Sequence, residues 1–221
     1  AARDGRLRRL PRDPARPEGE PYRFAAPFPR DEASGEYRLV ARDIAALGYT
    51  MWGRFSVLAL PATKGQIDVA VLGGARAADD ATIARWVTAT AHALDTVYGR
   101  FPIDHVLVAV VPSPDSDAVD FGRTVPAGGA SILMYVGERA GEKDLMDDWV
   151  LAHEFFHLGV PSMPHDGRWL DEGLATYYEP VLRARAGLRS VDALWAELRS
   201  NMARGVRTAA EPSLAVSEDH D

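Results

Sequence analysis

The chain has 221 residues, of which 47% are hydrophobic and 26% charged, and its formal net charge is −7. This composition is that of an ordinary globular protein, and it argues against a basic nucleic-acid surface. No apolar run approaches the roughly eighteen residues of a membrane-spanning helix, and the lack of cysteine excludes disulfides and thiolate metal sites.

Residues 1–30 carry eight arginines, four acidic residues and six of the fifteen prolines, without periodicity. Such a segment builds no core by itself, so we expect a tail or a strap lying over the domain. Binding of an acidic partner is the alternative. The start at Ala1-Ala2 suits cleavage by signal peptidase and favours a periplasmic or secreted protein, although a trimmed chain could begin in the same way.

From about residue 35 the pattern changes to that of regular structure. Runs of β-forming residues bounded by Gly and Pro predict strands over 37–41, 55–60 and 66–72, so that 31–75 is a β-rich N-terminal part. Asp79 or Asp80 can cap a helix that runs to about Tyr98 and ends at Gly99. The β-branched run 106–111 is typical of a strand buried on both faces.

Further along the chain, residues 129–135 form an apolar run after the pair Gly128-Gly129. Asp147 or Asp148 can then cap a helix, tethered to the core by Trp149, Leu151, Ala152 and Phe156. A second helix follows around residue 172. A third, from Val191 to about Arg204, offers Leu194, Trp195 and Leu198 for packing, and residues 211–221 form an acidic tail.

The first of these helices contains His153-Glu154-Phe155-Phe156-His157. Residues four apart lie on one face of a helix, so both imidazoles can bind one metal ion. A carboxylate beside the first ligand, as in Glu154, can take a proton from metal-activated water. Two histidines and one glutamate form a common hydrolytic zinc site. Glu172 can be the third ligand if its helix packs antiparallel on the first, with Gly173 allowing close approach.

The two motifs, His-Glu-x-x-His and Trp169-Leu-Asp-Glu-Gly-Leu-Ala-Thr-Tyr177, resemble those of the gluzincin metallopeptidases. This group contains thermolysin and the aminopeptidase-N-like enzymes, and the chain is most similar to the peptidase-MA-like and glycyl-aminopeptidase-like branches. The resemblance covers about residues 145–180. It implies an α+β fold with a thermolysin-like catalytic domain over 76–210, in which a mixed β-sheet with an edge substrate strand packs on a zinc-binding helix pair.

The resemblance also implies residue roles. His153, His157 and Glu172 would bind Zn²⁺, and Glu154 would be the general base. Glu179 matches a carboxylate that can orient a ligand histidine, with a solvated helix face as the alternative. Residues 129–135 would form the edge strand that pairs with substrate, with Gly128, Gly129, Ala130 and Ser131 at the substrate; a plain glycine turn is the alternative.

The chain also departs from the gluzincin pattern. Fourteen residues separate His157 from Glu172, fewer than in thermolysin or aminopeptidase N, and no tyrosine follows Tyr178 to act as oxyanion donor. His165 is a candidate donor, although a surface-loop histidine is the simpler interpretation. No acidic residue lies between Gly122 and Gly137, where aminopeptidase-like members hold the substrate amino terminus.

The sequence therefore predicts a zinc-dependent metallopeptidase that acts on a peptide or protein substrate. A further C-terminal domain or a partner chain would complete its cleft. The alternatives are an inactive peptide-binding module with the same fold, and a metal-dependent amidohydrolase acting on small amides. The motifs leave open whether cleavage is exo or endo.

Overall fold

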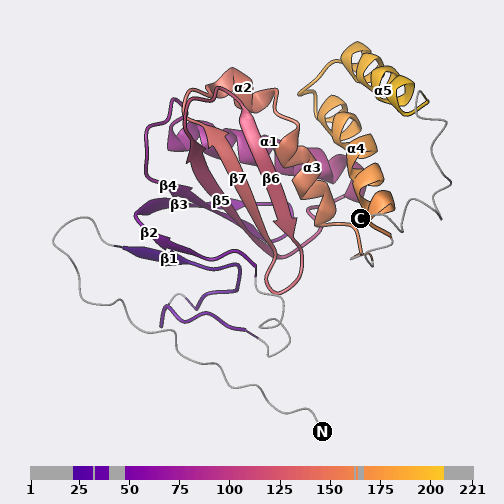
Figure 1. The fold of residues 1–221 in the computed structure, drawn as a ribbon. Helices are drawn as coiled ribbons and strands as arrows, with labels where there is room; N and C mark the ends of the chain where they lie inside the picture. Colours follow the sequence, from indigo (N-terminus) through magenta and orange to yellow (C-terminus); the bar gives the residue numbers. More distant parts are fainter. Residues whose placement is uncertain (1–21, 32, 40–47, 162, 164–166, 207–221) are drawn as a thin grey trace, which may run out of the picture.

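A computed structural model of the chain describes residues 22–31, 33–39, 48–161, 163 and 167–206. It is a mixed α/β structure in which a sheet is covered by helices (Figure 1). The elements in chain order are β1 (Arg23–Ala25), β2 (Met51–Gly53), β3 (Phe55–Pro61), β4 (Gln66–Leu72), α1 (Asp80–Tyr98), β5 (His105–Ser113), β6 (Val119–Val125), β7 (Ser131–Gly137), α2 (Glu142–Met146), α3 (Val150–His157), α4 (Arg168–Arg185) and α5 (Val191–Val206).

The main sheet has five strands in the order β3-β4-β5-β7-β6. Strands β4, β5 and β7 are parallel, whereas β3 and β6 run antiparallel to their neighbours at the two edges. The predicted strand over 106–111 is confirmed at the centre of this sheet, where residues 106–110 are buried. The predicted strands over 55–60 and 66–72 are confirmed as β3 and β4.

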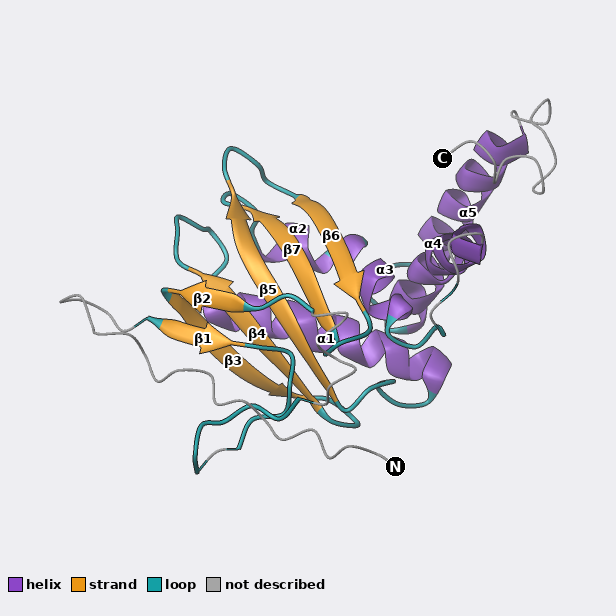
Figure 2. Ribbon diagram, turned by 60° about the horizontal axis from the view of Figure 1, so that its bottom comes forward, coloured by secondary structure: helices purple, strands orange, loops and turns teal. Residues whose placement is uncertain are grey.

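Alternation along the strands divides the core between the two faces of the sheet. Val69 and Val108 lie in the large core that the helices cover, whereas Ala70 and Leu107 face a smaller cluster with Ala25 of β1. Figure 2 shows α1, α2 and α3 behind the sheet, with β1 and β2 on the opposite side. Strands β3 and β4 of the predicted N-terminal part therefore share one sheet with β5, β6 and β7 of the predicted catalytic part.

The helices follow their predicted signals closely. Asp79 caps α1 by accepting a hydrogen bond from the Thr82 backbone N–H, and Gly99 ends the helix in the left-handed conformation. Helix α3 packs on α1, β6 and α4, while α5 contacts α4. Leu194 and Leu198 of α5 are buried as expected, but Trp195 is exposed, which corrects its predicted packing role. No helix in the described part of the chain could span a membrane.

The prediction that residues 129–135 form the sheet edge is wrong. After β5 the chain passes to the outer position, forms β6, and turns back so that β7 lies between β5 and β6. The edge strand is therefore β6, which precedes the glycine pair.

The segment 37–41 also differs from its prediction. Tyr37 makes only an isolated bridge with Arg30, and residues 40–47 lie outside the described residues.

Candidate metal centre

Helix α3 is held in place by hydrogen bonds at its start and by buried apolar side chains along its length. The Asp148 carboxylate accepts hydrogen bonds from the backbone N–H groups of Val150 (2.9 Å) and Leu151 (3.0 Å), so it caps the start of the helix from the residue before Trp149. Burial raises the pKa of Asp148 to about 6, although these bonds favour the charged form. Buried side chains on α3 then hold the helix against the sheet and α1, among them Leu151, Phe155 and Phe156.

Trp149 differs from its predicted role as a core anchor, because 53% of the residue is exposed. Its ring instead meets the imidazole of His153 edge-on, at a centroid distance of 5.8 Å. The indole therefore covers one side of a candidate ligand and faces solvent on the other. This is a position from which it can contact a bound molecule.

The structure brings His153, His157 and Glu172 together. One ligand atom from each residue lies within 4.8 Å of the other two, so this group can hold a metal ion. Nε2 of His153 is 3.2 Å from Oε2 of Glu172, and Nε2 of His157 is 3.7 Å from the same oxygen. The two imidazoles are largely buried, whereas half of the Glu172 side chain is exposed. The group therefore opens to solvent on its carboxylate side.

Asp171 is a site residue that sequence reasoning missed. Its Oδ1 lies 3.0 Å from Nδ1 of His157, on the opposite side of the ring from Nε2. A carboxylate there selects the tautomer with the proton on Nδ1 and leaves Nε2 free to bind a metal. The signal was present in the sequence, because adjacent helical residues point about 100° apart and can reach different atoms of one site. Nδ1 of His153, in contrast, is buried without a hydrogen-bond partner among the described residues.

The Glu154 side chain contacts the edge strand β6. Its residue is buried, and its Oε2 accepts a hydrogen bond of 2.7 Å from the hydroxyl of Thr124 on β6. The same hydroxyl lies 2.8 Å from the backbone oxygen of Glu154. Glu154 follows the candidate ligand His153 directly on α3, while its carboxylate is bound by β6.

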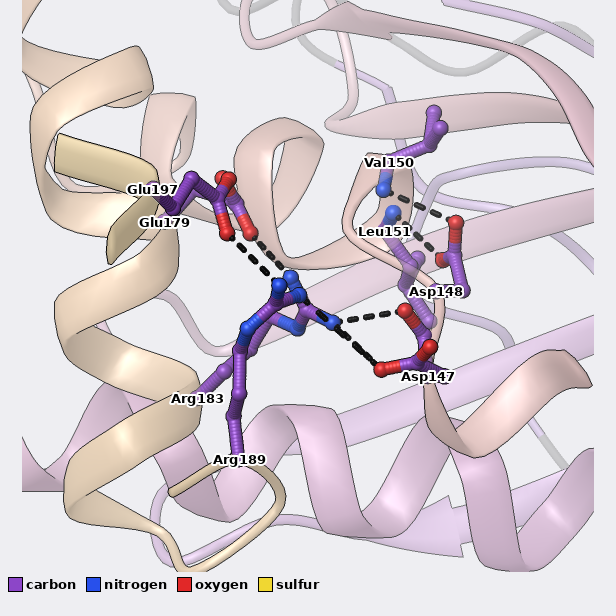
Figure 3. A network of polar contacts seen from close by, with 8 residues as sticks. All are labelled: Asp147, Asp148, Val150, Leu151, Glu179, Arg183, Arg189 and Glu197. Atoms are coloured by element: carbon purple, nitrogen blue, oxygen red, sulfur yellow. Dashed lines mark hydrogen bonds and ion pairs between the residues drawn. The ribbon is translucent and has the colours of Figure 1, made fainter. Parts of the chain in front are cut away.

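The predicted role of Glu179 in orienting a ligand histidine is corrected by its contacts. Glu179 is buried and forms an ion pair of 2.7 Å with Nη1 of Arg183, one helical turn further along α4. Nη2 of Arg183 donates to the backbone oxygen of Asp147 at 2.6 Å and lies 3.2 Å from its Oδ1. Figure 3 shows this network, in which Arg183 lies between Glu179 and the segment that leads into α3.

This network connects the two helices that carry the candidate ligands. Asp147 lies directly before the Asp148 cap of α3, and Arg183 lies on α4, the helix of Glu172. Burial raises the pKa of Glu179 to about 7, an effect that the Arg183 guanidinium only partly offsets. The alternative for Glu179, a solvated helix face, is also wrong, because only 4% of the residue is exposed.

The residues predicted to bind substrate, Gly128 to Ser131, contact other parts of the chain instead of the ligand group. Gly128 and Ser131 bind the chain itself, through bonds from the backbone N–H groups of Gly48 (3.1 Å) and Tyr49 (2.7 Å). A Cβ at Gly129 would lie 2.7 Å from the Phe28 ring and from the Pro27 oxygen. Gly128, Gly129 and Ala130 therefore form a glycine turn that leads into β7 at Ser131 and packs on the N-terminal segments, which favours the plain glycine turn.

Two further predictions concern the connection between the helices and the start of α4. His165 lies outside the described residues, so its role as oxyanion donor stays a prediction. Gly173 is not at a close approach, because a Cβ there would meet no atom within 4 Å.

Comparison with known proteins shows a resemblance in fold to a solved structure. No family model matches the sequence, and no curated protein matches it. A solved structure of an aminopeptidase N family protein from Idiomarina loihiensis matches with a TM-score of 0.55 and 12% identity. The match covers 78% of this chain and 33% of that one, so this chain spans about a third of that protein's length. At this identity the likeness concerns the fold alone.

Proposed function

We propose that the chain is a zinc-dependent metallopeptidase of the gluzincin type. The observation that carries this proposal is the convergence of His153, His157 and Glu172 to within 4.8 Å at their ligand atoms. The helix pair that supplies them packs beside the edge of a mixed sheet, and the fold resembles that of an aminopeptidase N family protein.

The donor set fits zinc. Two imidazole nitrogens and one carboxylate oxygen form a set used by hydrolytic zinc sites, whereas magnesium and calcium prefer oxygen ligands alone. His153, His157 and Glu172 would hold the ion, and Asp171 would keep the His157 ring in the required tautomer. When bound, zinc supplies Lewis acidity toward the scissile carbonyl and acidifies a water molecule.

Glu154 would act as general base. It follows the candidate ligand His153 directly on α3, and the hydrogen bond from Thr124 fixes the orientation of its carboxylate. In this role it accepts a proton from the attacking water and donates it to the leaving amine, a contribution of roughly a hundred- to ten-thousandfold in rate.

The edge strand β6 is the proposed place for substrate. One side of β6 pairs with β7, and its other side has no neighbouring strand within the described sheet. An extended peptide added there would gain main-chain hydrogen bonds without strict sequence demands. Since this chain spans about a third of the aminopeptidase N family protein, a further domain or a partner chain would complete the cleft and supply an oxyanion donor.

The test is a hydrolysis screen with a mixture of unblocked and blocked peptides, with and without a chelator. Glu154→Gln should retain the metal yet lose at least about a hundredfold in hydrolysis. Glu142→Gln is the matched control, because Glu142 is exposed on α2 and pairs with Arg85. Wild-type activity in metal-replete Glu154→Gln would refute the assignment. Binding of peptide without cleavage by the wild type would favour the peptide-binding module instead.

A further inference from the structure

The hydroxyl of Thr124 touches Glu154 twice. It donates to Oε2 of the carboxylate at 2.7 Å or to the backbone oxygen of the same residue at 2.8 Å. A hydroxyl carries one proton and two lone pairs, so it can donate to a carboxylate and accept from a carboxylic acid. The contact can therefore hold the side chain in both states that a general base passes through.

Gly122 of β6 is a second residue that contacts the Glu154 side chain. It lies two residues before Thr124 on β6 and so faces the same side of the strand. A Cβ at this position would come within 2.6 Å of both Cγ of Glu154 and Cγ1 of Val150. Because neither atom is at the end of a long flexible chain, a larger residue would displace Glu154 or separate β6 from α3.

These contacts fix the Glu154 side chain between two residues of the edge strand. Gly122 has no side chain and so leaves space for Cγ of Glu154, and Thr124 donates a hydrogen bond to the Glu154 carboxylate. The strand that we propose to pair with substrate is thereby the same strand that orients the general base. A shift of about 1 Å in such a group costs on the order of a hundredfold in rate.

We propose that Thr124 is a positioning residue for the Glu154 carboxylate, acting together with Gly122. The expected effect on kcat rests on the proposed function. The contact between Thr124 and Glu154 does not, and it can be tested in the metal-free chain. Thr124 lies thirty residues before Glu154 and outside both motifs, so it extends the site onto the sheet.

The kinetic test compares Thr124→Val with Thr124→Ser. Valine keeps the shape and removes the hydroxyl, so kcat should fall about tenfold or more with KM within about threefold and metal content unchanged. Serine keeps the hydroxyl and should restore most of kcat. Thr90→Val is the matched control, because Thr90 is a buried helical threonine whose hydroxyl bonds Trp86 on α1.

The second readout does not depend on activity. In the metal-free chain labelled with ¹³C at glutamate carboxyls, the Glu154 signal is assigned by its absence in Glu154→Gln. It should move in Thr124→Val and in Gly122→Ala but stay in place in Thr124→Ser and Thr90→Val. If Thr124→Val does not fold, as judged by its thermal unfolding, Thr124→Ala replaces it in both measurements.

Two results would overturn the inference. One is an unmoved Glu154 signal in Thr124→Val, and the other is equal loss of kcat and of metal, which would make Thr124 merely structural. If the wild type hydrolyses no peptide, the proposed function fails, yet the carboxyl signal still decides whether Thr124 holds Glu154.

Discussion

Replacing Arg183 by methionine tests how the two ligand-bearing helices are held together. Arg183 is 1% exposed and connects Glu179 on α4 to Asp147, which precedes the cap of α3. Methionine roughly preserves the apolar volume but removes the charge and every donor. Glu179 would then be buried without its cation, and the backbone oxygen of Asp147 would lose this donor.

The expected loss of stability depends on pH. Removing one partner of a buried ion pair typically costs about 3–5 kcal/mol, because the other charge is left uncompensated. That range is an upper bound at pH 8, because the variant can instead protonate Glu179, at about 1.4 kcal/mol for each pH unit above the pKa of about 7. At pH 5.5 the carboxyl is protonated, so mainly the lost hydrogen bonds remain, at about 1–3 kcal/mol. The loss in the free energy of unfolding should therefore shrink on acidification.

The assay is urea unfolding of the metal-free chain at both pH values, followed by tryptophan fluorescence. Arg85→Met is the matched control, since Arg85 forms an exposed ion pair with Glu142 at 2.9 Å and such pairs contribute about 0–1 kcal/mol. A loss below about 1 kcal/mol at pH 8 would refute the reasoning. A loss of equal size at the two pH values would show that Glu179 is not the group left uncompensated.

Two other predictions concern Glu179 and Asp171. The folded chain raises the pKa of Glu179 from 4.5 to about 7, so it retains this proton where the unfolded chain has lost it. Its contribution to the free energy of unfolding should therefore fall by roughly 3 kcal/mol as pH rises from about 4.5 to about 7. Glu179→Gln should flatten that part of the pH profile in urea unfolding, and an unchanged profile would contradict the assignment. Asp171→Asn should weaken zinc binding about 10- to 100-fold in a competition assay with a chelating dye, because the amide no longer selects the His157 tautomer. An affinity equal to that of the wild type would show that Asp171 does not orient the ring.

Local features of the fold could be predicted from the sequence. Asp79 and Gly99 mark the ends of α1 because capping depends on residues within one turn. The central strand could be recognised because residues buried on both faces form a continuous apolar run. The spacing of His153 and His157 likewise follows from helical geometry alone.

Features that depend on distant contacts could not be predicted in this way. The order of β6 and β7 depends on how a hairpin inserts next to β5, and nothing in either strand's own pattern indicates this. The bond from Thr124 to Glu154 has no local signal either. The ion pair of Glu179 could have been predicted from the sequence, because Arg183 follows four residues later on the same helix and side chains at this spacing interact.

The most direct test of the central claim is metal content by mass spectrometry on protein purified without added metal. Wild type should contain about one zinc per chain, Glu172→Ala should lose most of it, and Glu142→Ala should retain it, because Glu142 lies outside the ligand group. A wild-type chain that contains no metal and takes up none from added zinc would contradict the account.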